Sequence, residues 1–251
     1  MPPKVVSFWS YSDGFTSTYL TMSTAKALTD EGYKVLVLDM NLNSPGLQLP
    51  NLNTTPGLVD LFNNALEEQE KPDLFELADL TSKYSFTIDR PNGDDQARNI
   101  TIMPAGAIEF GNKKYEFNLT ELDIAALYKE GLGQKLFLVL KTRLLELAFD
   151  YILVNSSPGY SDEAGVCCRD LADLVVAIEK DLNKPYIDRF LDALKKIDRD
   201  VITLNGSYEA KVELSDLGAL ETKITYCPEL IIRHFVEKEF KSSFTQTLER
   251  Q

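Results

Sequence analysis

Residues 5–18 read VVSFWSYSDGFTST, an apolar strand that runs into a short polar loop and then into the start of a helix. Residues 34–47, KVLVLDMNLNSPGL, give a second apolar strand that ends in Asp39 and leads to a Pro-Gly pair. This is the outline of a phosphate-binding loop, in which glycine N–H groups surround phosphates and a lysine neutralises them. Here the loop keeps one glycine, Gly14, gains an aspartate, Asp13, and has no lysine. The outline is therefore present while most of the phosphate chemistry is missing.

Three segments, in the right order and spacing, and a fourth near the C-terminus resemble the ParA/MinD-like (SIMIBI-class) deviant-Walker P-loop ATPases. Residues 11–18 (YSDGFTST) and 39–47 (DMNLNSPGL) match the branch of that family with the loop YKGGVGRT and the strand end DxDLEAPGL. Residues 150–162, DYILVNSSPGYSD, are similar to its Walker B and switch segment. Residues 224–230, ITYCPEL, are similar to its IPYDPEL segment. The likeness runs from about residue 5 to about residue 230, almost the whole chain.

The resemblance implies that the family's catalytic positions are degenerate here. Ser12 stands in place of the signature lysine, and Ser17 in place of the P-loop lysine or arginine. Asn41 stands where the family has the aspartate that orients the attacking water, and Asn155 stands at the Walker B aspartate. Two further loop glycines are replaced by Asp13 and Thr16. We therefore expect no catalytic residue to be functional.

The family residues that this sequence keeps imply at most a weak nucleotide-binding site. Thr18 would offer Mg²⁺ a hydroxyl, and Asp39 is the first acid of the family's Asp-x-Asp pair, so these two are the candidate metal ligands. Asn205 matches an asparagine that the family places against adenine, although it also reads as a turn residue before Gly206. If nucleotide binding is retained, the resemblance assigns it to Ser12, Asp13, Gly14, Phe15, Thr16, Ser17, Thr18, Asp39, Asn205 and Pro228.

Electrostatics argues against turnover at this loop. Phosphoryl transfer depends on positioning and on charge stabilisation by Lys, Arg and Mg²⁺. Two like charges about 4 Å apart repel by roughly 4 kcal/mol at an effective dielectric of 20, so Asp13 opposes a phosphate. Taken without the resemblance, the loop is ordinary turn chemistry with Ser17 or Asp13 as a helix N-cap. A helix N-terminus can still bind an anion weakly. We expect no required cofactor, and at most weak ATP and Mg²⁺ binding.

Composition excludes several other function classes. The chain has 251 residues, 44% of them hydrophobic, and a formal net charge of −13, which disfavours nonspecific nucleic-acid binding. Cys167, Cys168 and Cys227 lack metal-ligand spacing, and the adjacent pair reads as buried thiols. No signal peptide or apolar stretch of membrane-spanning length is present, so a cytoplasmic location is expected. Glutamates interrupt the basic residues of the amphipathic segment 230–244, so we expect it to pack on protein and not on a membrane.

Apolar strands alternate with amphipathic helices, which predicts one domain over residues 1–251. The fold class is α/β, with a single doubly wound, mostly parallel sheet of about seven strands and helices on both faces. Strands are predicted at 5–10, 35–39, 100–103, 151–155, 174–178, 201–205 and 224–226. Helices are predicted at 18–31, 58–66, 73–82, 119–129, 134–149, 163–171, 185–196 and 228–240. Residues 89–95 read as a polar hairpin or loop.

The sequence favours a pseudo-ATPase that acts through self-association or partner docking, in a scaffold, positioning or regulatory role. The family works as a dimer closed over nucleotide, so a homodimer or higher assembly, or a protein partner, is expected. Tyr11, Phe15 and Tyr19 are the candidate interface residues, because aromatics are enriched among interface anchors. One alternative is an active ATPase, acting in partitioning or intracellular positioning, whose site is rebuilt with charge from Lys113, Lys114, Lys141 or Arg143. Another is a regulatory subunit of an active paralogue.

Overall fold

The structure of the protein is a computed structural model that describes residues 2–12, 14–47, 54–67, 75–88, 99–108, 113–179, 184–205 and 231–235. Among the predicted site residues, Asp13 and Pro228 lie outside these residues, as do the side chains of Phe15 and Asn205. The predicted strand 224–226 and the predicted loop 89–95 also lie outside them.

A seven-stranded sheet with the strand order β3-β4-β2-β5-β1-β6-β7 forms the centre of the molecule. All neighbouring strands are parallel except β3, which runs antiparallel to β4 at the edge. The predicted doubly wound, mostly parallel sheet is confirmed. The strands are β1 (Lys4–Ser10), β2 (Val35–Met40), β3 (Phe86–Ile88), β4 (Ile100–Met103), β5 (Tyr151–Ser156), β6 (Leu174–Glu179) and β7 (Asp200–Asn205).

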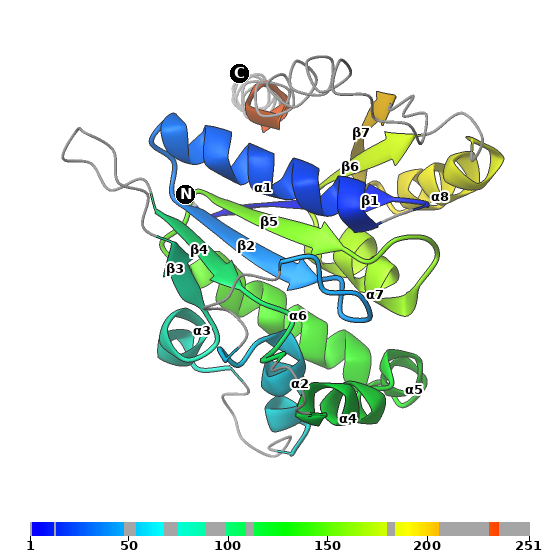
Figure 1. The fold of residues 1–251 in the computed structure, drawn as a ribbon. Coiled ribbons are helices and arrows are strands. Elements are labelled where there is room, and N and C mark those ends of the chain that lie inside the picture. Colours follow the sequence, from blue (N-terminus) through cyan, green and yellow to red (C-terminus); the bar gives the residue numbers. More distant parts are fainter. Residues whose placement is uncertain are drawn as a thin grey trace, which may run out of the picture.

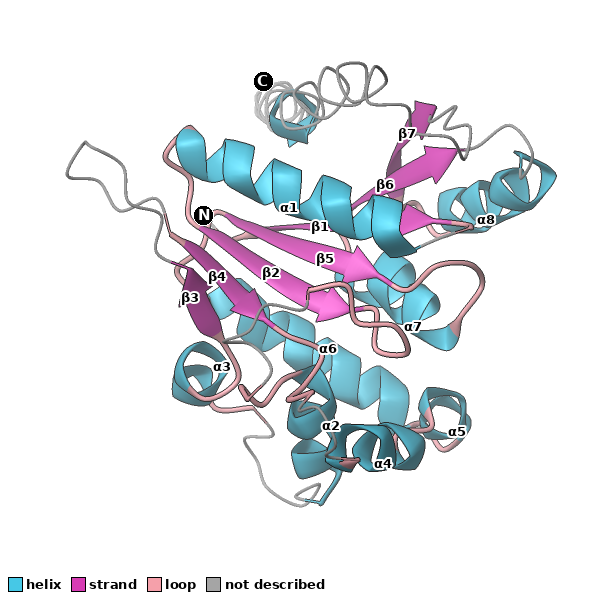
Figure 2. Ribbon diagram, viewed as in Figure 1, coloured by secondary structure: helices cyan, strands magenta, loops and turns pink. Residues whose placement is uncertain are grey.

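Helices cover both faces of this sheet (Figures 1 and 2). Helix α1 and the helical residues 231–235 lie over one face, and most of the other helices lie over the opposite face. The helices are α1 (Gly14–Asp30), α2 (Leu58–Glu67), α3 (Leu77–Ser82), α4 (Lys114–Glu121), α5 (Ile124–Lys129), α6 (Leu132–Glu146), α7 (Asp162–Gly165), the π-helix η1 (Val166–Leu171) and α8 (Lys184–Lys196). No helix in the described part of the chain is long and apolar enough to cross a membrane.

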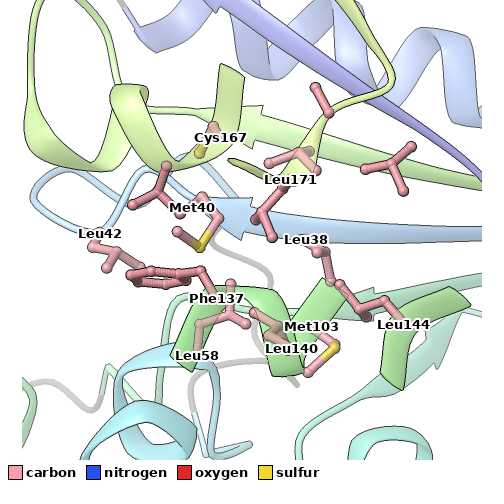
Figure 3. Close-up of a cluster of buried hydrophobic side chains, with 14 of the residues drawn as sticks. Leu38, Met40, Leu42, Leu58, Met103, Phe137, Leu140, Leu144, Cys167 and Leu171 are labelled. Carbon is pink, nitrogen blue, oxygen red and sulfur yellow. The ribbon is translucent and has the colours of Figure 1, made fainter. Parts of the chain in front are cut away.

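A hydrophobic core lies between the sheet and the helices on each face. There are two such cores because successive side chains of a strand point to opposite faces. Along β1, Val6 and Phe8 belong to the core under α1, whereas Val5 and Trp9 belong to the core on the other face. The second core is the larger, and Figure 3 shows part of it, with Leu38 and Met40 of β2 facing Phe137 of α6. Both predicted buried thiols, Cys167 and Cys168, lie fully buried in this core. Strands with both faces covered explain the continuous apolar runs in the sequence.

Several predicted helices differ in their bounds from the structure, and one strand was not predicted. Helix α1 begins at Gly14, earlier than the predicted start at residue 18. The predicted helix 119–129 is two helices, because the Asp123 side chain accepts a hydrogen bond from the N–H of Ala126 (2.8 Å) and starts a new helix there. The predicted helix 163–171 becomes π-helical from Val166. Strand β3 was not predicted, since three residues carry too little periodicity to be recognised.

Candidate functional site

The carboxyl ends of β2 and β5 bring together the two residues that matter most at the predicted site. Asp39 and Asn155 are register partners on these neighbouring parallel strands. Helix α1 starts at the same edge of the sheet, which places Thr18 in its first turns beside them (Figure 1). Ligands of open α/β sheets bind at this edge. The structure therefore brings Thr18, Asp39 and Asn155 together at one edge of the sheet.

The side-chain amide of Asn155 bridges the two surviving family residues. Its Nδ2 donates to Thr18 Oγ1 at 2.9 Å and to Asp39 Oδ1 at 2.8 Å. Thr18 Oγ1 in turn donates to the carbonyl of Gly14 at 2.7 Å. Thr18, Asp39 and Asn155 are all buried, and below they are called the polar cluster. An amide can make this bridge only because it carries two hydrogens, which an aspartate in the same place would lack.

Asp39 is a fully buried carboxylate whose identified hydrogen-bond donors are all neutral. Besides Asn155, the backbone N–H groups of Leu47 (3.1 Å) and Asn41 (3.4 Å) donate to it. Burial raises its pKa from 3.8 to about 6, and the hydrogen bonds from Leu47, Asn155 and Asn41 oppose that rise. At neutral pH the cluster therefore holds a negative charge inside the protein.

Two glycines close the polar cluster by letting backbone approach it. A Cβ on Gly46 would lie 2.2 Å from Thr18 Oγ1, and a Cβ on Gly14 would lie 2.5 Å from Asn41 Nδ2. The Gly46 position requires the absence of a side chain, because its Cβ would also lie 2.8 Å from Thr18 Cγ2 and 3.0 Å from Thr18 Cβ. At Gly14 the near atom is the end of the Asn41 side chain, so a Cβ there would displace that side chain. Within the described residues, no group of three or more His, Cys, Asp or Glu side chains could hold a metal ion.

The loop after β2, residues 41–47, is held at both ends. Near its start, the carbonyl of Leu42 accepts a hydrogen bond of 2.6 Å from the Tyr115 hydroxyl of α4. At its end, the N–H of Leu47 donates to Asp39. The pKa of Tyr115 is raised, chiefly by burial and then by the nearby charge of Asp39. Both anchors are buried, whereas Asn43, Ser44 and Gly46 between them are exposed, so the loop is fixed at two points and open to solvent in its middle.

The remaining predicted loop residues divide between buried and accessible. Ser17 is buried and its hydroxyl donates to the carbonyl of Gly14 at 3.0 Å. The proposal that Ser17 caps the helix is therefore wrong, because it lies inside α1 and bonds back to the preceding turn. Ser12 is exposed and Thr16 is half-buried.

Two of the four cations suggested for a rebuilt site lie at the opposite edge of the sheet. Lys141 pairs with Asp173 (3.0 Å), and Asp173 also accepts the N–H of Val5 near the amino end of β1. Arg143 pairs with Glu146 on the last turn of α6, shortly before β5 begins. Lys113 and Lys114 are exposed at the start of α4, next to the Tyr115 that reaches the loop after β2.

Beside the polar cluster, three tyrosines form an exposed aromatic surface that the sequence only partly indicated. Tyr11 stacks on Tyr186 of α8 (centroids 5.1 Å apart) and meets Tyr160 edge-on at 5.5 Å. Tyr160 and Tyr186 are 52% and 47% exposed, and the Tyr160 hydroxyl donates to the carbonyl of Tyr186. Below, Tyr11, Tyr160 and Tyr186 are called the tyrosine surface.

A rigid base supports the tyrosine surface. Trp9 is fully buried, stacks on Phe190 (4.0 Å), and donates from Nε1 to the carbonyl of Gly159 at 2.8 Å. The N–H of Gly159 donates a hydrogen bond of 3.0 Å to the carbonyl of Ser10. The φ of Gly159 is 69°, in the left-handed region that favours glycine. Tyr19, the other described candidate interface residue, is 39% exposed on α1. The Pro-Gly-Tyr sequence at 158–160 was the available signal for Tyr160, whereas nothing local marked Tyr186.

Comparison with known proteins supports the fold through structure alone. The sequence matches no protein-family model, and it matches no curated protein. A cobyrinic acid a,c-diamide synthase from Mycobacterium smegmatis with bound ADP and magnesium superposes with a TM-score of 0.60 and 14% identity, over 93% of this chain and 95% of that one. McdA from Cyanothece, in its apo form, superposes with a TM-score of 0.52 and 18% identity, over 90% and 82%. The pNOB8 ParA bound to nonspecific DNA superposes with a TM-score of 0.53 and 14% identity, over 94% of this chain and 99% of that one.

Proposed function

Starting from a chain with the ParA/MinD-like, SIMIBI-class P-loop ATPase fold, we propose that this protein does not hydrolyse ATP and acts by associating with itself or with a protein partner. The observation that carries this proposal is the Asn155 amide, which donates to both Thr18 and Asp39. Mg²⁺ takes oxygen ligands through their lone pairs and keeps several waters. An N–H donor directed at the same two oxygens is incompatible with a metal ion at that point.

The charges around the cluster support the same conclusion. Ser12 and Ser17 carry no charge where lysines would neutralise phosphate, and Asp39 adds a buried carboxylate. Neither Lys141 nor Arg143 compensates, because both form ion pairs at the far edge of the sheet. Among the residues that the structure describes, no cation contacts the polar cluster, which supports the absence of the electrostatic stabilisation on which phosphoryl transfer depends.

Phosphate release by the purified protein with Mg²⁺ and ATP, alone and with co-encoded proteins, tests this proposal. We expect background rates, and we expect Asp39→Ala to leave them unchanged. Calorimetry with ATP and with ADP should show weak binding that Mg²⁺ does not strengthen. Turnover that disappears in Asp39→Ala, or sub-micromolar ATP binding that requires Mg²⁺, would overturn the proposal. Lys113→Ala and Lys114→Ala would then locate the rebuilt site.

The tyrosine surface supports association as the function. Its half-exposed aromatic rings are held on a rigid base, and preorganised aromatic side chains are typical interface anchors. Light scattering on the nucleotide-free protein should show self-association, or a complex should form with a co-encoded paralogue. Tyr160→Ser with Tyr186→Ser, and separately Tyr19→Ser, should weaken it.

Phe117→Ser is the matched control for association, because Phe117 is 64% exposed on α4, away from the tyrosine surface. It should leave association unchanged. A monodisperse monomer that ignores every co-encoded protein would contradict the proposal. Exclusive binding to an active paralogue would identify the protein as a regulatory subunit.

Nonspecific nucleic-acid binding is not part of the proposed function. One structural neighbour is a ParA bound to nonspecific DNA, but this chain has 39 acidic against 26 basic residues. Such an excess of negative charge opposes contact with phosphate backbones. We expect no shift of a labelled duplex at physiological salt, with or without ATP.

A further inference from the structure

The three rings of the tyrosine surface come from three separate elements of the fold. Tyr11 directly follows β1, Tyr160 lies in the loop after β5, and Tyr186 lies in the first turn of α8. Strands β1 and β5 are neighbours in the sheet, and α8 lies beside the carboxyl end of β1 (Figure 1). Rings from three elements keep one arrangement only where the residues that support them are held in place.

Trp9, the penultimate residue of β1, contacts all three of these elements. It lies two residues before Tyr11 in the chain. Its Nε1 atom donates to the carbonyl of Gly159 at 2.8 Å, and Gly159 is the residue before Tyr160. Its ring stacks on Phe190 with the centroids 4.0 Å apart, one helical turn after the tyrosine of α8. A single side chain therefore joins the supports of all three tyrosines.

Trp9 is a rigid support because the sheet and the core hold it on every side. Its side chain is fully buried, and its backbone is in register with Ala177 of β6. Side chains in a closely packed core occupy defined rotamers. The sheet therefore sets the direction in which the indole N–H points.

The indole N–H fixes the loop after β5 at one point. Gly159 is bonded through both of its backbone groups, because its carbonyl accepts from Trp9 and its N–H donates to the carbonyl of Ser10 at 3.0 Å. Packing in the core requires only an apolar ring, whereas this hydrogen bond requires a donor aimed at the loop. A phenylalanine in place of Trp9 would offer no donor. The N–H thus has a role that core packing alone does not explain.

We propose that Trp9 is the positioning residue of the tyrosine surface, and that its N–H holds Tyr160 in the arrangement used for association. The inference rests on the proposed function, and it adds the residue on which the geometry of that contact surface depends. Without the N–H, the carbonyl of Gly159 is released and Tyr160 has more orientations available. Association must then restrict those orientations, which weakens the complex.

Replacing tryptophan throughout the protein changes a single site, because Trp9 is the only tryptophan in the chain. Protein made with 3-benzothienylalanine keeps the shape of the ring system but has sulfur in place of the N–H. Protein made with 7-azatryptophan keeps the N–H and is the matched control. By light scattering over a concentration series, we expect the benzothienyl protein to associate about fivefold more weakly than the control.

NMR of the tyrosine rings shows whether the change is local. The signals are assigned with Tyr→Phe variants, and Tyr84 and Tyr115, which are buried in the core away from this surface, serve as internal references. The benzothienyl protein should show shifted signals for Tyr160 and Tyr186 and unshifted signals for the two references. A general loss of stability would not move the first pair alone.

Asn63→Leu is a second control, because it also removes one part-buried side-chain hydrogen bond of 2.8 Å to a backbone carbonyl, that of Asn118. It should leave association unchanged, and equal weakening by this variant would overturn the proposal. Unshifted tyrosine signals in the benzothienyl protein, or unchanged association despite shifted signals, would also overturn it. If the unmodified protein does not associate at all, the proposed function fails, and the tyrosine signals alone decide the role of Trp9.

Discussion

The polar cluster and the tyrosine surface lie on the same edge of one sheet, yet their side chains are used in opposite ways. Thr18, Asp39 and Asn155 are buried, and the Asn155 amide donates hydrogen bonds to the other two. Tyr160 and Tyr186 present about half of their surface to solvent. The polar cluster is buried, whereas the neighbouring tyrosine surface is aromatic and about half-exposed. The comparison teaches that neighbouring residues at one edge of a sheet can differ sharply in exposure, and under the proposed function the exposed ones form the contact surface.

The largest predicted effect comes from restoring an acid to the polar cluster. Asn155→Asp replaces a donor 2.8 Å from Asp39 by a second carboxylate, so we expect a loss of roughly 3 kcal/mol in the free energy of unfolding at pH 7.5. Lowering the pH should reduce the loss, because the pair can then share a proton. Urea unfolding in EDTA measures both effects.

Asn118→Asp is the matched control, because Asn118 also donates to an aspartate, Asp60 (3.2 Å), but at a partly exposed site. Its effect should stay below about 1 kcal/mol, because solvent screens such a pair. If Asn155→Asp is as stable as the wild type in EDTA, the polar cluster is more open than the structure indicates.

A smaller effect is expected in the pH dependence of stability. The folded-state pKa of Asp39, about 6, exceeds the ordinary 3.8, so the folded protein binds this proton more tightly than the unfolded chain does. Between pH 7.5 and pH 5 this single group should add on the order of 1 kcal/mol to stability, and the gain is lost as pH rises through 6.

Asp39→Asn removes this titration, so its unfolding free energy should lack that contribution over the same pH interval. The comparison uses the change with pH within each protein, which cancels any constant cost of the substitution. Parallel pH curves for the two proteins would mean that Asp39 is not a buried, titrating group.

The smallest effect on stability is expected at the tyrosine surface. Tyr160→Ser with Tyr186→Ser should lower the free energy of unfolding by less than about 1 kcal/mol per substitution, because both rings are half-exposed. Thermal unfolding at low protein concentration measures this. A much larger loss would show that the rings support the fold, and the association assay with these variants would then need another surface.

The sheet was predictable from the sequence because each central strand is an apolar run that ends in a polar residue. Val35 to Leu38 before Asp39, and Tyr151 to Val154 before Asn155, carry that pattern, and the parallel register follows from the helices between them. The short edge strand β3 and the π-turns of η1 could not be predicted, since neither has a distinctive spacing. The start of α1 was placed late because Ser17 reads as a cap until its bond to Gly14 is seen.

The resemblance named Thr18, Asp39 and Asn155 as positions of one site, and the structure places these three side chains in contact. That the Asn155 amide would donate to both others depends on side-chain orientation, which no sequence pattern encodes. Tyr186 was missed for a related reason, because it reaches Tyr11 only through the packing of α8 beside β1.

The loop after β2 is fixed by Tyr115 at Leu42 and by Asp39 at Leu47. This bears on how the lifetime of the proposed complex is set. Where a loop is released and bound again in each round of nucleotide hydrolysis, that cycle sets when a protein complex forms and dissociates. Under the proposed function this loop passes through no such cycle, because the protein's own side chains hold it at Leu42 and Leu47. Under the proposed function, occupancy of the complex then follows mass action, and its lifetime equals the reciprocal of one dissociation rate constant. A cell would control such a protein through its synthesis and degradation.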